Sequence, residues 1–233
     1  VTPVFANPST VTFDENGCLT NGTYFHLDCY NSWCSISQKA VANPNEGTND
    51  FKCWSDLVAK HSSDYSSYSI RLASNLDFGG YDEANNKCKM ANFTPIQFSN
   101  ANAEFDGRSE YTISGFCYED NDGSGDNSMG FMKGVKTVRN VTFDNAHVVV
   151  KNAEQGSVVG IVTDDIARES STFSNVRVTN SYVAGTQAGA FAGKVSGYEN
   201  HTIQNSGVVD TKVYGLDAAN QGVMTSAAGS FVG

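Results

Sequence analysis

The chain has 233 residues, of which 39% are hydrophobic, and a formal net charge of -10 at pH 7. This length suits one large domain or two small ones, and 22 glycines with only four prolines are typical of a folded, turn-rich chain, not a disordered linker. No stretch approaches the roughly 18 apolar residues of a membrane-spanning helix, and the Lys and Arg residues are too scattered to form a nucleic-acid footprint. We therefore expect neither a membrane span nor a nucleic-acid partner.

The cysteines indicate the compartment. All six lie in the first half of the chain, at Cys18, Cys29, Cys34, Cys53, Cys88 and Cys117. Two interpretations compete: zinc ligation in a reducing compartment, or disulfides in an oxidising one. No C-x-x-C pair occurs and the four histidines are widely spread, which favours disulfides and an extracellular or cell-surface location. The opening VTPVFANPS has no basic start and no long apolar run, so we expect that any secretion signal has been removed.

Residues 1–66 are predicted to form a Cys-rich cap with one short helix at about 50–61. The helical spacing is carried by Phe51, Trp54, Leu57, Val58 and His61. Asn49 or Asp50 would be its N-cap, and the apolar side would face the core. A stack of strands exposes apolar side chains and open strand edges at its end, and the cap would cover them.

Residues 67–233 contain a repeated pattern. Four ungapped segments share it: YTISGFCYED (111–120), KTVRNVTFDN (136–145), STFSNVRVTN (171–180) and HTIQNSGVVD (201–210). Their first apolar column contains Ile113, Val138, Phe173 and Ile203, and their last position contains Asp120, Asn145, Asn180 and Asp210. Apolar residues alternate with polar ones, as in strands with one buried face, and Asn, Asp and Gly suit the bends between strands. A second short strand follows each bend, with Val148, Val183 and Val213 in register.

One such repeat cannot bury its apolar face alone. If the copies stack, each strand pairs in parallel with its counterpart about 4.8 Å away, which gives a β-solenoid. The alternative is an all-β sandwich of antiparallel hairpins. The persistence of the columns favours the solenoid, so we predict a single structural unit in which the cap continues into the repeats.

A Gly-x-x-x-Gly unit recurs in this region. The four copies are GFMKG (130–134), GSVVG (156–160), GAFAG (189–193) and GSFVG (229–233). A membrane-helix dimer motif would need an apolar 20-residue setting, which is missing here. We expect the glycines to allow neighbouring copies to approach closely, with Val158, Phe191 and Phe231 pointing into the core. The last copy ends the chain where another repeat should begin, so we expect something to cover it.

The segments YSIRLASNLDFGG, NFTPIQF and AEFDGRSEYTISGF, followed by the Gly-x-x-x-Gly units, resemble the opening of bacterial surface proteins that carry GLUG repeats. The resemblance runs from about residue 50 to residue 233. Phe93 stands where that family usually has Trp, and Arg108-Ser109 replaces its usual Asn-Gly. The resemblance implies a right-handed parallel β-helix in a secreted or cell-surface protein involved in adhesion or surface structure, and it supplies no catalytic residues.

Calcium is the only cofactor that the sequence suggests. Asp120, Asp122, Ser124 and Asp126 alternate like the first half of an oxygen-ligand calcium loop, with Gly125 at the sixth position. The glutamate expected at the twelfth position is replaced by Phe131. A solvated loop between repeats is the alternative.

The disulfide pairing can be predicted in part. Cys117 falls in an outward column with Thr142, Arg177 and Gly207, so its sulfur would reach a loop packed outside the strands. Cys88 lies in such a loop, which predicts a Cys88–Cys117 pair. The other four cysteines would pair among themselves within the cap, with a connectivity that the sequence leaves open.

Two further sets of residues suggest chemistry. Tyr182, Tyr198 and Tyr214 are candidates for stacking on the sugar rings of a glycan. In the ungapped alignment Glu119 and Asp144 fall on adjacent copies near Arg177, which would be an acid pair for polysaccharide cleavage.

These observations lead to one preferred function and two alternatives. We expect a non-catalytic extracellular surface module, an adhesin or structural component, whose partner is a surface glycan or a host or cell-surface protein. A subunit that stacks end to end with itself into an extracellular filament is one alternative. A polysaccharide lyase or hydrolase built on a β-helix is the other.

Overall fold

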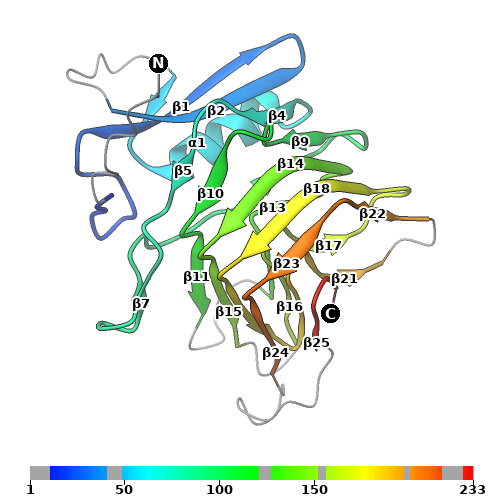
Figure 1. Ribbon diagram of the computed structural model, residues 1–233. Coiled ribbons are helices and arrows are strands. Elements are labelled where there is room, and N and C mark those ends of the chain that lie inside the picture. Colours follow the sequence, from blue (N-terminus) through cyan, green and yellow to red (C-terminus); the bar gives the residue numbers. More distant parts are fainter. Residues whose placement is uncertain are drawn as a thin grey trace, which may run out of the picture.

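The computed structural model describes residues 11–40, 49–120, 127–151, 156–196, 200–216 and 228–232. These residues are mostly β-strand, with one short α-helix, one π-helical turn and three disulfides. The described strands form an 11-stranded sheet, three four-stranded sheets and a two-stranded hairpin. Figure 1 shows the N-terminal strands β1 and β2 at one end of this assembly and β22 and β24 at the other.

The N-terminal end is covered by an antiparallel hairpin. Strand β1 (Thr23–Tyr30) turns into β2 (Trp33–Ala40) through Asn31 and Ser32, which both have a left-handed backbone. The short strand β3 (Asp50–Phe51) pairs with the other edge of β1. β3 therefore pairs with Phe25 and His26 on the outer edge of β1.

The predicted helix begins later than expected. α1 spans Trp54–Lys60 and continues into the π-helix η1 (His61–Tyr65). Its N-cap is Cys53, without a side-chain capping hydrogen bond, so the prediction of Asn49 or Asp50 as N-cap is wrong. The reason is that Asp50 is used by strand β3. The predicted core-facing side is confirmed by the burial of Trp54, Leu57, Val58 and His61.

The largest sheet collects strands from the cap and from the repeats. Its order is β22-β18-β14-β9-β4-β2-β1-β3, with β5, β10 and β23 alongside. Every pairing from β2 to β22 is parallel. The strands are β4 (Ser69–Leu72), β5 (Leu76–Asp77), β9 (Glu104–Asp106), β10 (Thr112–Ser114), β14 (Thr137–Asp144), β18 (Thr172–Thr179), β22 (Thr202–Gln204) and β23 (Gly207–Val209).

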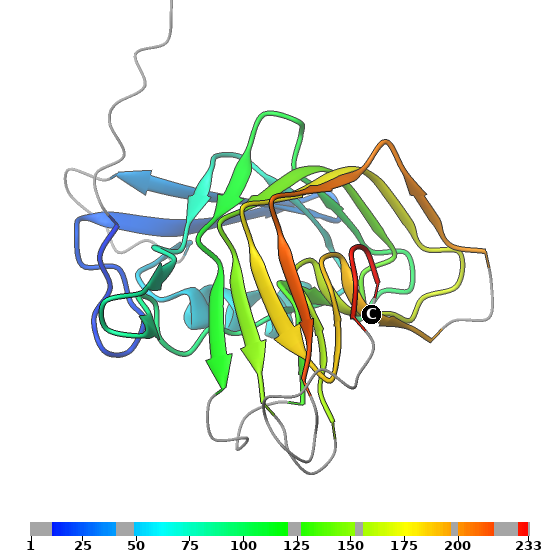
Figure 2. The same cartoon turned by 60° about the horizontal axis from the view of Figure 1, so that its bottom comes forward.

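Three further sheets each contain four parallel strands from successive stretches of chain. The first contains β11 (Cys117–Asp120), β15 (His147–Val150), β19 (Tyr182–Gly185) and β24 (Lys212–Gly215). The second contains β12 (Ser128–Met129), β16 (Val158–Gly160), β20 (Gln187–Gly189) and β25 (Ala228–Gly229). The third contains β8 (Ile96–Gln97), β13 (Met132–Lys133), β17 (Thr163–Ile166) and β21 (Ala192–Val195). Figure 2 shows strands of successive copies lying side by side, from green through yellow to orange.

We call residues 104–133, 137–166, 172–195 and 202–229 repeats one to four. The predicted columns are present in repeats two to four. Val138, Phe173 and Ile203 lie opposite one another, as do Phe143, Val178 and Val208, and Val148, Val183 and Val213. These side chains share one apolar core with those of the cap. The alternating pattern therefore predicted the buried face correctly here.

The predicted alignment of repeat one is wrong. Ile113 lies opposite Phe143, and Phe105 takes the place opposite Val138. Residues 107–111 separate β9 from β10, whereas β14 is continuous over the same region. β10 and β11 pair in register with residues 142–144 and 147–150, whereas the prediction aligned 111–120 with 136–145, so it displaced the whole first copy by five positions.

The bend between the large sheet and the β11 sheet uses one backbone conformation in every repeat. Gly115, Asn145, Asn180 and Asp210 all have positive φ, between 48° and 66°. Gly115 takes the place that was predicted for Asp120, because repeat one is displaced. Asn, Asp and Gly are the residues that adopt this conformation at least cost, and this explains why the column is restricted to them.

The Gly-x-x-x-Gly units lie where neighbouring repeats approach closely. A Cβ atom on Gly160 would lie 2.7 Å from the Cα of Ala192 in the next repeat, and one on Gly193 would collide with the backbone nitrogen of Val159. A Cβ atom on Gly130 would lie 2.5 Å from the nitrogen of Asp164. The predicted role of these glycines is confirmed.

The register of the second Gly-x-x-x-Gly copy differs from the prediction. Gly160, the last residue of GSVVG, lies opposite Gly189, the first residue of GAFAG. Val158 is consequently half-buried, and Val159 is the buried residue, so the prediction for Val158 is wrong. Phe191 is fully buried as predicted, whereas Phe231 is 37% exposed on the last repeat.

Candidate functional site

A hairpin outside the sheets is tied to the β11 sheet. Strands β6 (Tyr81–Asp82) and β7 (Lys87–Cys88) form it, and it projects from the body of the molecule (Figure 1). Cys88 is disulfide-bonded to Cys117 at the start of β11, which is the predicted pair. The disulfide holds this hairpin beside the first strand of that sheet.

The remaining cysteines are also paired. Cys18 is bonded to Cys53, and Cys29 to Cys34 across the β1–β2 hairpin. Both disulfides lie within the cap, as predicted. All six cysteines are therefore in disulfides, so the zinc alternative is wrong. Three disulfides fit a protein of an oxidising compartment.

The column that contains Cys117 was assigned incorrectly. Cys117 lies opposite His147, which lies opposite Tyr182, which lies opposite Lys212. The predicted neighbours Thr142, Arg177 and Gly207 form a separate column on the large sheet. The displacement of repeat one is again the cause. The true column brings aromatic and charged side chains onto one face.

Four rings form an aromatic column along this face. The ring of Tyr81 in the hairpin stacks on His147, with centroids 3.8 Å apart and planes 5° apart. His147 stacks on Tyr182 at 4.9 Å and 13°, and Tyr182 contacts Tyr214 at 5.3 Å. The column thus joins the hairpin to repeats two, three and four.

The environment of the column changes the titration of its members. Burial lowers the pKa of His147, and the negative charges of Glu119 and Glu83 act in the opposite direction. Burial raises the pKa of Tyr182, helped by Tyr214 and Glu119. Nε2 of His147 and Oε2 of Glu119 are buried without a hydrogen-bond partner among the described residues. Both atoms therefore retain hydrogen-bonding capacity.

A cavity of about 450 Å³ lies beside the aromatic column. This size falls within the range of small-molecule sites, about 300–1,000 Å³. Its lining comes from the hairpin and from repeats two to four: Tyr81, Glu83, Asn145, Ala146, His147, Asn180, Ser181, Tyr182, Asp210 and Lys212. Asn145, Asn180 and Asp210 are exposed bend residues, one from each repeat. The cavity thus presents a row of equivalent amide and carboxylate groups.

A second cavity, of about 350 Å³, also reaches Asn145. It is lined by Val11, Asp77, Gly79, Lys89, Ser114, Gly115, Asp144 and Asn145. Two of its carboxylates are partly engaged: Asp77 accepts a hydrogen bond from the Gly79 amide at 2.8 Å, and Asp144 accepts one from the Thr179 hydroxyl at 2.7 Å. Asn145 is the one residue that lines both cavities, and we call the two cavities together the bend groove.

The predicted tyrosines do not form a free stacking platform. One face of the Tyr182 ring is covered by His147 and the other contacts Tyr214. Tyr214 is 36% exposed, and Tyr198 lies outside the described residues. The stacking prediction for Tyr182 is therefore wrong, since its ring edge and hydroxyl are the parts left to line the cavity.

The proposed acid pair is not assembled. Glu119 lies opposite Val149, whereas Asp144 lies opposite Thr179, so the two carboxylates occupy different columns. Asp144 also accepts a hydrogen bond from the side-chain amide of Asn180 at 2.8 Å. Arg177 is exposed in the column of Thr142. The arrangement predicted for polysaccharide cleavage is therefore wrong.

The calcium prediction falls mostly outside the described residues. Asp122, Ser124 and Asp126 lie there, while Asp120 is buried at the end of β11. Among the described residues, no three His, Cys, Asp or Glu side chains gather as metal ligands.

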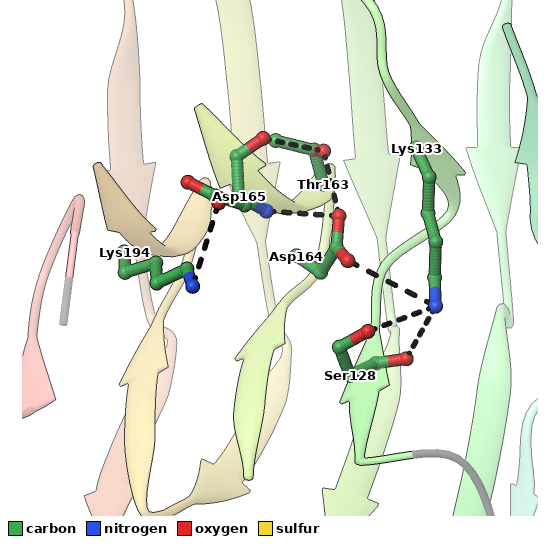
Figure 3. Close-up of polar contacts among 6 residues, drawn as sticks. All are labelled: Ser128, Lys133, Thr163, Asp164, Asp165 and Lys194. Atoms are coloured by element: carbon green, nitrogen blue, oxygen red, sulfur yellow. Dashed lines mark hydrogen bonds and ion pairs between the residues drawn. The ribbon is translucent and has the colours of Figure 1, made fainter. Parts of the chain in front are cut away.

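A second polar cluster links the strands of the β8 sheet (Figure 3). Nζ of Lys133 donates to the carbonyl and hydroxyl oxygens of Ser128 and lies 3.8 Å from the Asp164 carboxylate. Asp165, next in the chain, pairs with Lys194 at 3.6 Å. The ion pairs thus run from β13 through β17 to β21. Each carboxylate already has cationic and backbone or hydroxyl partners, so we interpret this cluster as structural.

Sequence reasoning missed most of the residues that line the bend groove. Asn145, Asn180 and Asp210 were identified only as bend residues, although their shared spacing already implied that they lie in a row. Tyr81 and His147 were missed because nothing in the local pattern indicates that the hairpin folds onto β15. The one signal for that contact was the predicted Cys88–Cys117 pair.

No helix among the described residues is long and apolar enough to cross a membrane. Comparisons of the chain with protein-family models, curated proteins and solved structures found no match. The function must therefore be argued from the site itself.

Proposed function

We propose that the chain is a non-catalytic extracellular surface module of the right-handed parallel β-helix type that binds a glycan in the bend groove. The β-helix is supported by the parallel, in-register pairing of each repeat with its counterpart in all four sheets. The extracellular location is supported by the three disulfides. The resemblance to bacterial proteins with GLUG repeats points the same way.

The observation that carries glycan binding is the lining of the larger cavity. It offers amide, carboxylate, hydroxyl, phenol and ammonium groups from separate chain segments. Such groups hydrogen-bond the hydroxyls of a sugar, which donate and accept at once. The stacked rings behind them are held by one another and by the hairpin, so the polar groups lie on a rigid support.

A carbohydrate array tests this proposal. The protein should bind a subset of glycans, and Tyr182→Ala should weaken that binding at least tenfold because it removes the centre of the aromatic column. Tyr30→Ala is the matched control, since Tyr30 is 75% exposed on the β1–β2 hairpin, away from the groove. A reducing-sugar assay on every bound glycan should show no release. Binding that both variants retain would overturn the proposal, and sugar release would overturn its non-catalytic part.

Self-association is a second candidate, favoured by the last repeat. Ile203 and Val209 are 38% and 48% exposed, whereas Phe173, the counterpart of Ile203, is 1% exposed. Strands β22 and β24 end their sheets. Contacts between two such edges would join two copies through their last repeats. Light scattering across a concentration series would reveal a dimer, and electron microscopy a filament.

A further inference from the structure

We propose that the bend groove accepts an uncharged, extended, β-linked polysaccharide that lies along the stacking direction of the repeats, one sugar opposite each repeat. This inference rests on the proposed glycan-binding function and specifies the class of glycan. It follows from the spacing, length and charge of the groove.

The spacing sets the repeat of the ligand. Parallel strands lie about 4.8 Å apart, so equivalent side chains of neighbouring repeats recur at that distance. Asn145, Asn180 and Asp210 are such equivalents, and so are His147, Tyr182 and Lys212 one strand position further on. This distance is close to the length of one sugar in an extended β-1,4-linked chain, in which successive sugars are turned by half a turn, so every second sugar presents the same hydroxyls to the groove. An α-1,4-linked chain coils instead, so after one or two sugars its hydroxyls would no longer align with the side chains of successive repeats.

The length of the groove sets the number of sugars. The two cavities together reach from Asp77 and Ser114, through Asn145 and Asn180, to Asp210. Asp77 pairs in register with Ser114, and Ser114 with Asp144, so these residues mark five successive levels of the stack. Affinity should therefore grow with chain length up to about five sugars.

The charge of the groove excludes acidic glycans. Four carboxylates line it, those of Asp77, Glu83, Asp144 and Asp210, against the two ammonium groups of Lys89 and Lys212. A uronic acid in every sugar would place like charges beside these carboxylates, which is unfavourable. Hydroxyl groups would instead meet amides and carboxylates with which they can hydrogen-bond.

Calorimetry with three series of oligosaccharides tests the inference. The probes are cello-oligosaccharides, malto-oligosaccharides and oligogalacturonates of two to six sugars. We expect the affinity for the cello series to rise at least tenfold from two to five sugars and then to level off. The other two series should bind at least tenfold more weakly at every length. Equal binding of the malto series, or no dependence on length, would overturn the inference and leave glycan binding intact. If no oligosaccharide binds and the array is also negative, the proposed function itself fails.

Variants at the bend locate the ligand without straining the backbone. Asn180→Gly removes the amide but keeps a residue that adopts positive φ freely. It should weaken cellopentaose binding at least fivefold. Asn175→Gly is the matched control, because Asn175 is also exposed with positive φ, in the same repeat, but lines neither cavity of the groove. Asp210→Gly, at the end of the row, should shorten the plateau from five sugars to four. Equal effects of Asn180→Gly and Asn175→Gly would contradict the placement.

Discussion

The two halves of the molecule are held together differently. Residues 11–120 contain all three disulfides and most of an aromatic cluster in which Trp54 contacts Phe25, Phe78, Phe93 and Phe131. This half is irregular, with an added loop in repeat one and an attached hairpin. Because its strands do not repeat one another residue for residue, disulfides and large aromatic side chains stabilise it.

Residues 127–232 rely instead on equivalence between repeats. Columns of Val, Phe and Ala side chains and closely packed glycines form its core, and side chains of one repeat accept hydrogen bonds from the backbone of another. The Ser181 hydroxyl accepts the Ala146 N–H at 2.9 Å, and the Ser157 hydroxyl accepts the Thr186 N–H at 2.8 Å. In this half any change that disturbs the spacing of two repeats acts on all of these contacts.

Removal of one large ring from each half should give the largest effects and separate the two halves. Trp54 and Phe173 are both 1% exposed. Trp54 contacts four other aromatic rings and donates its indole N–H to the Thr94 carbonyl oxygen. Among the described residues, the one aromatic ring that contacts Phe173 is that of Phe191. We expect Trp54→Ala to lower the free energy of unfolding by about 5 kcal/mol and Phe173→Ala by about 3 kcal/mol. Urea denaturation measures both losses. A larger loss for Phe173→Ala would contradict the comparison.

A smaller effect is expected where a methyl group is added between repeats. Gly160→Ala would place its Cβ against the Thr163 carbonyl and 2.7 Å from the Ala192 Cα, so backbone must move. We expect a loss of roughly 2–3 kcal/mol in the free energy of unfolding. Gly207→Ala is the control in the same half, because nothing lies within 4 Å of its added Cβ. Its effect should stay within about 0.5 kcal/mol, and a similar loss in both variants would show that glycine flexibility, not close approach, explains Gly160.

The two halves also differ in how much of them could be predicted. In repeats two to four the same number of residues separates the first core residue (Val138, Phe173 or Ile203) from the bend residue (Asn145, Asn180 or Asp210). An ungapped alignment therefore assigned their core columns correctly. In repeat one the predicted alignment matched Gly115 with Asn140, although Gly115 occupies the position of Asn145, and the errors for Cys117, Glu119 and Asp120 all follow from that displacement.

The candidate site could be predicted only in its regular part. The row from Asn145 to Asp210 follows from the repeat spacing, because positive φ restricts that position to a few residue types. The stacking of Tyr81 on His147 could not be predicted, since it depends on how a single, non-repeating hairpin packs against β15. The start of α1 was missed for a related reason: strand β3 competes for Asp50 through its pairing with β1.

The smallest expected effect concerns the pH dependence of stability, to which one buried histidine in each half contributes. His61 is fully buried, and burial lowers its pKa, while the backbone of Tyr68 acts in the opposite direction. His147 is half-buried, and burial also lowers its pKa. In each case the unfolded chain binds a proton more readily than the folded one, so stability is full above about pH 6.5 and is lost as the pH falls through that value.

Replacement of each histidine by an apolar residue should reveal which half is more sensitive to acid. Each histidine can contribute a slope of up to about 1.4 kcal/mol per pH unit to the free energy of unfolding below pH 6.5. Urea denaturation between pH 4.5 and 7.5 measures this slope, since that range brackets the ordinary histidine pKa of about 6.5. Below pH 6.5 the free energy of unfolding should fall less steeply with decreasing pH in His61→Leu than in His147→Phe. Glu119 and Glu83 partly offset the effect of burial at His147, and no charged side chain has this role at His61. Equal slopes for the two variants would mean that these carboxylates do not act on His147.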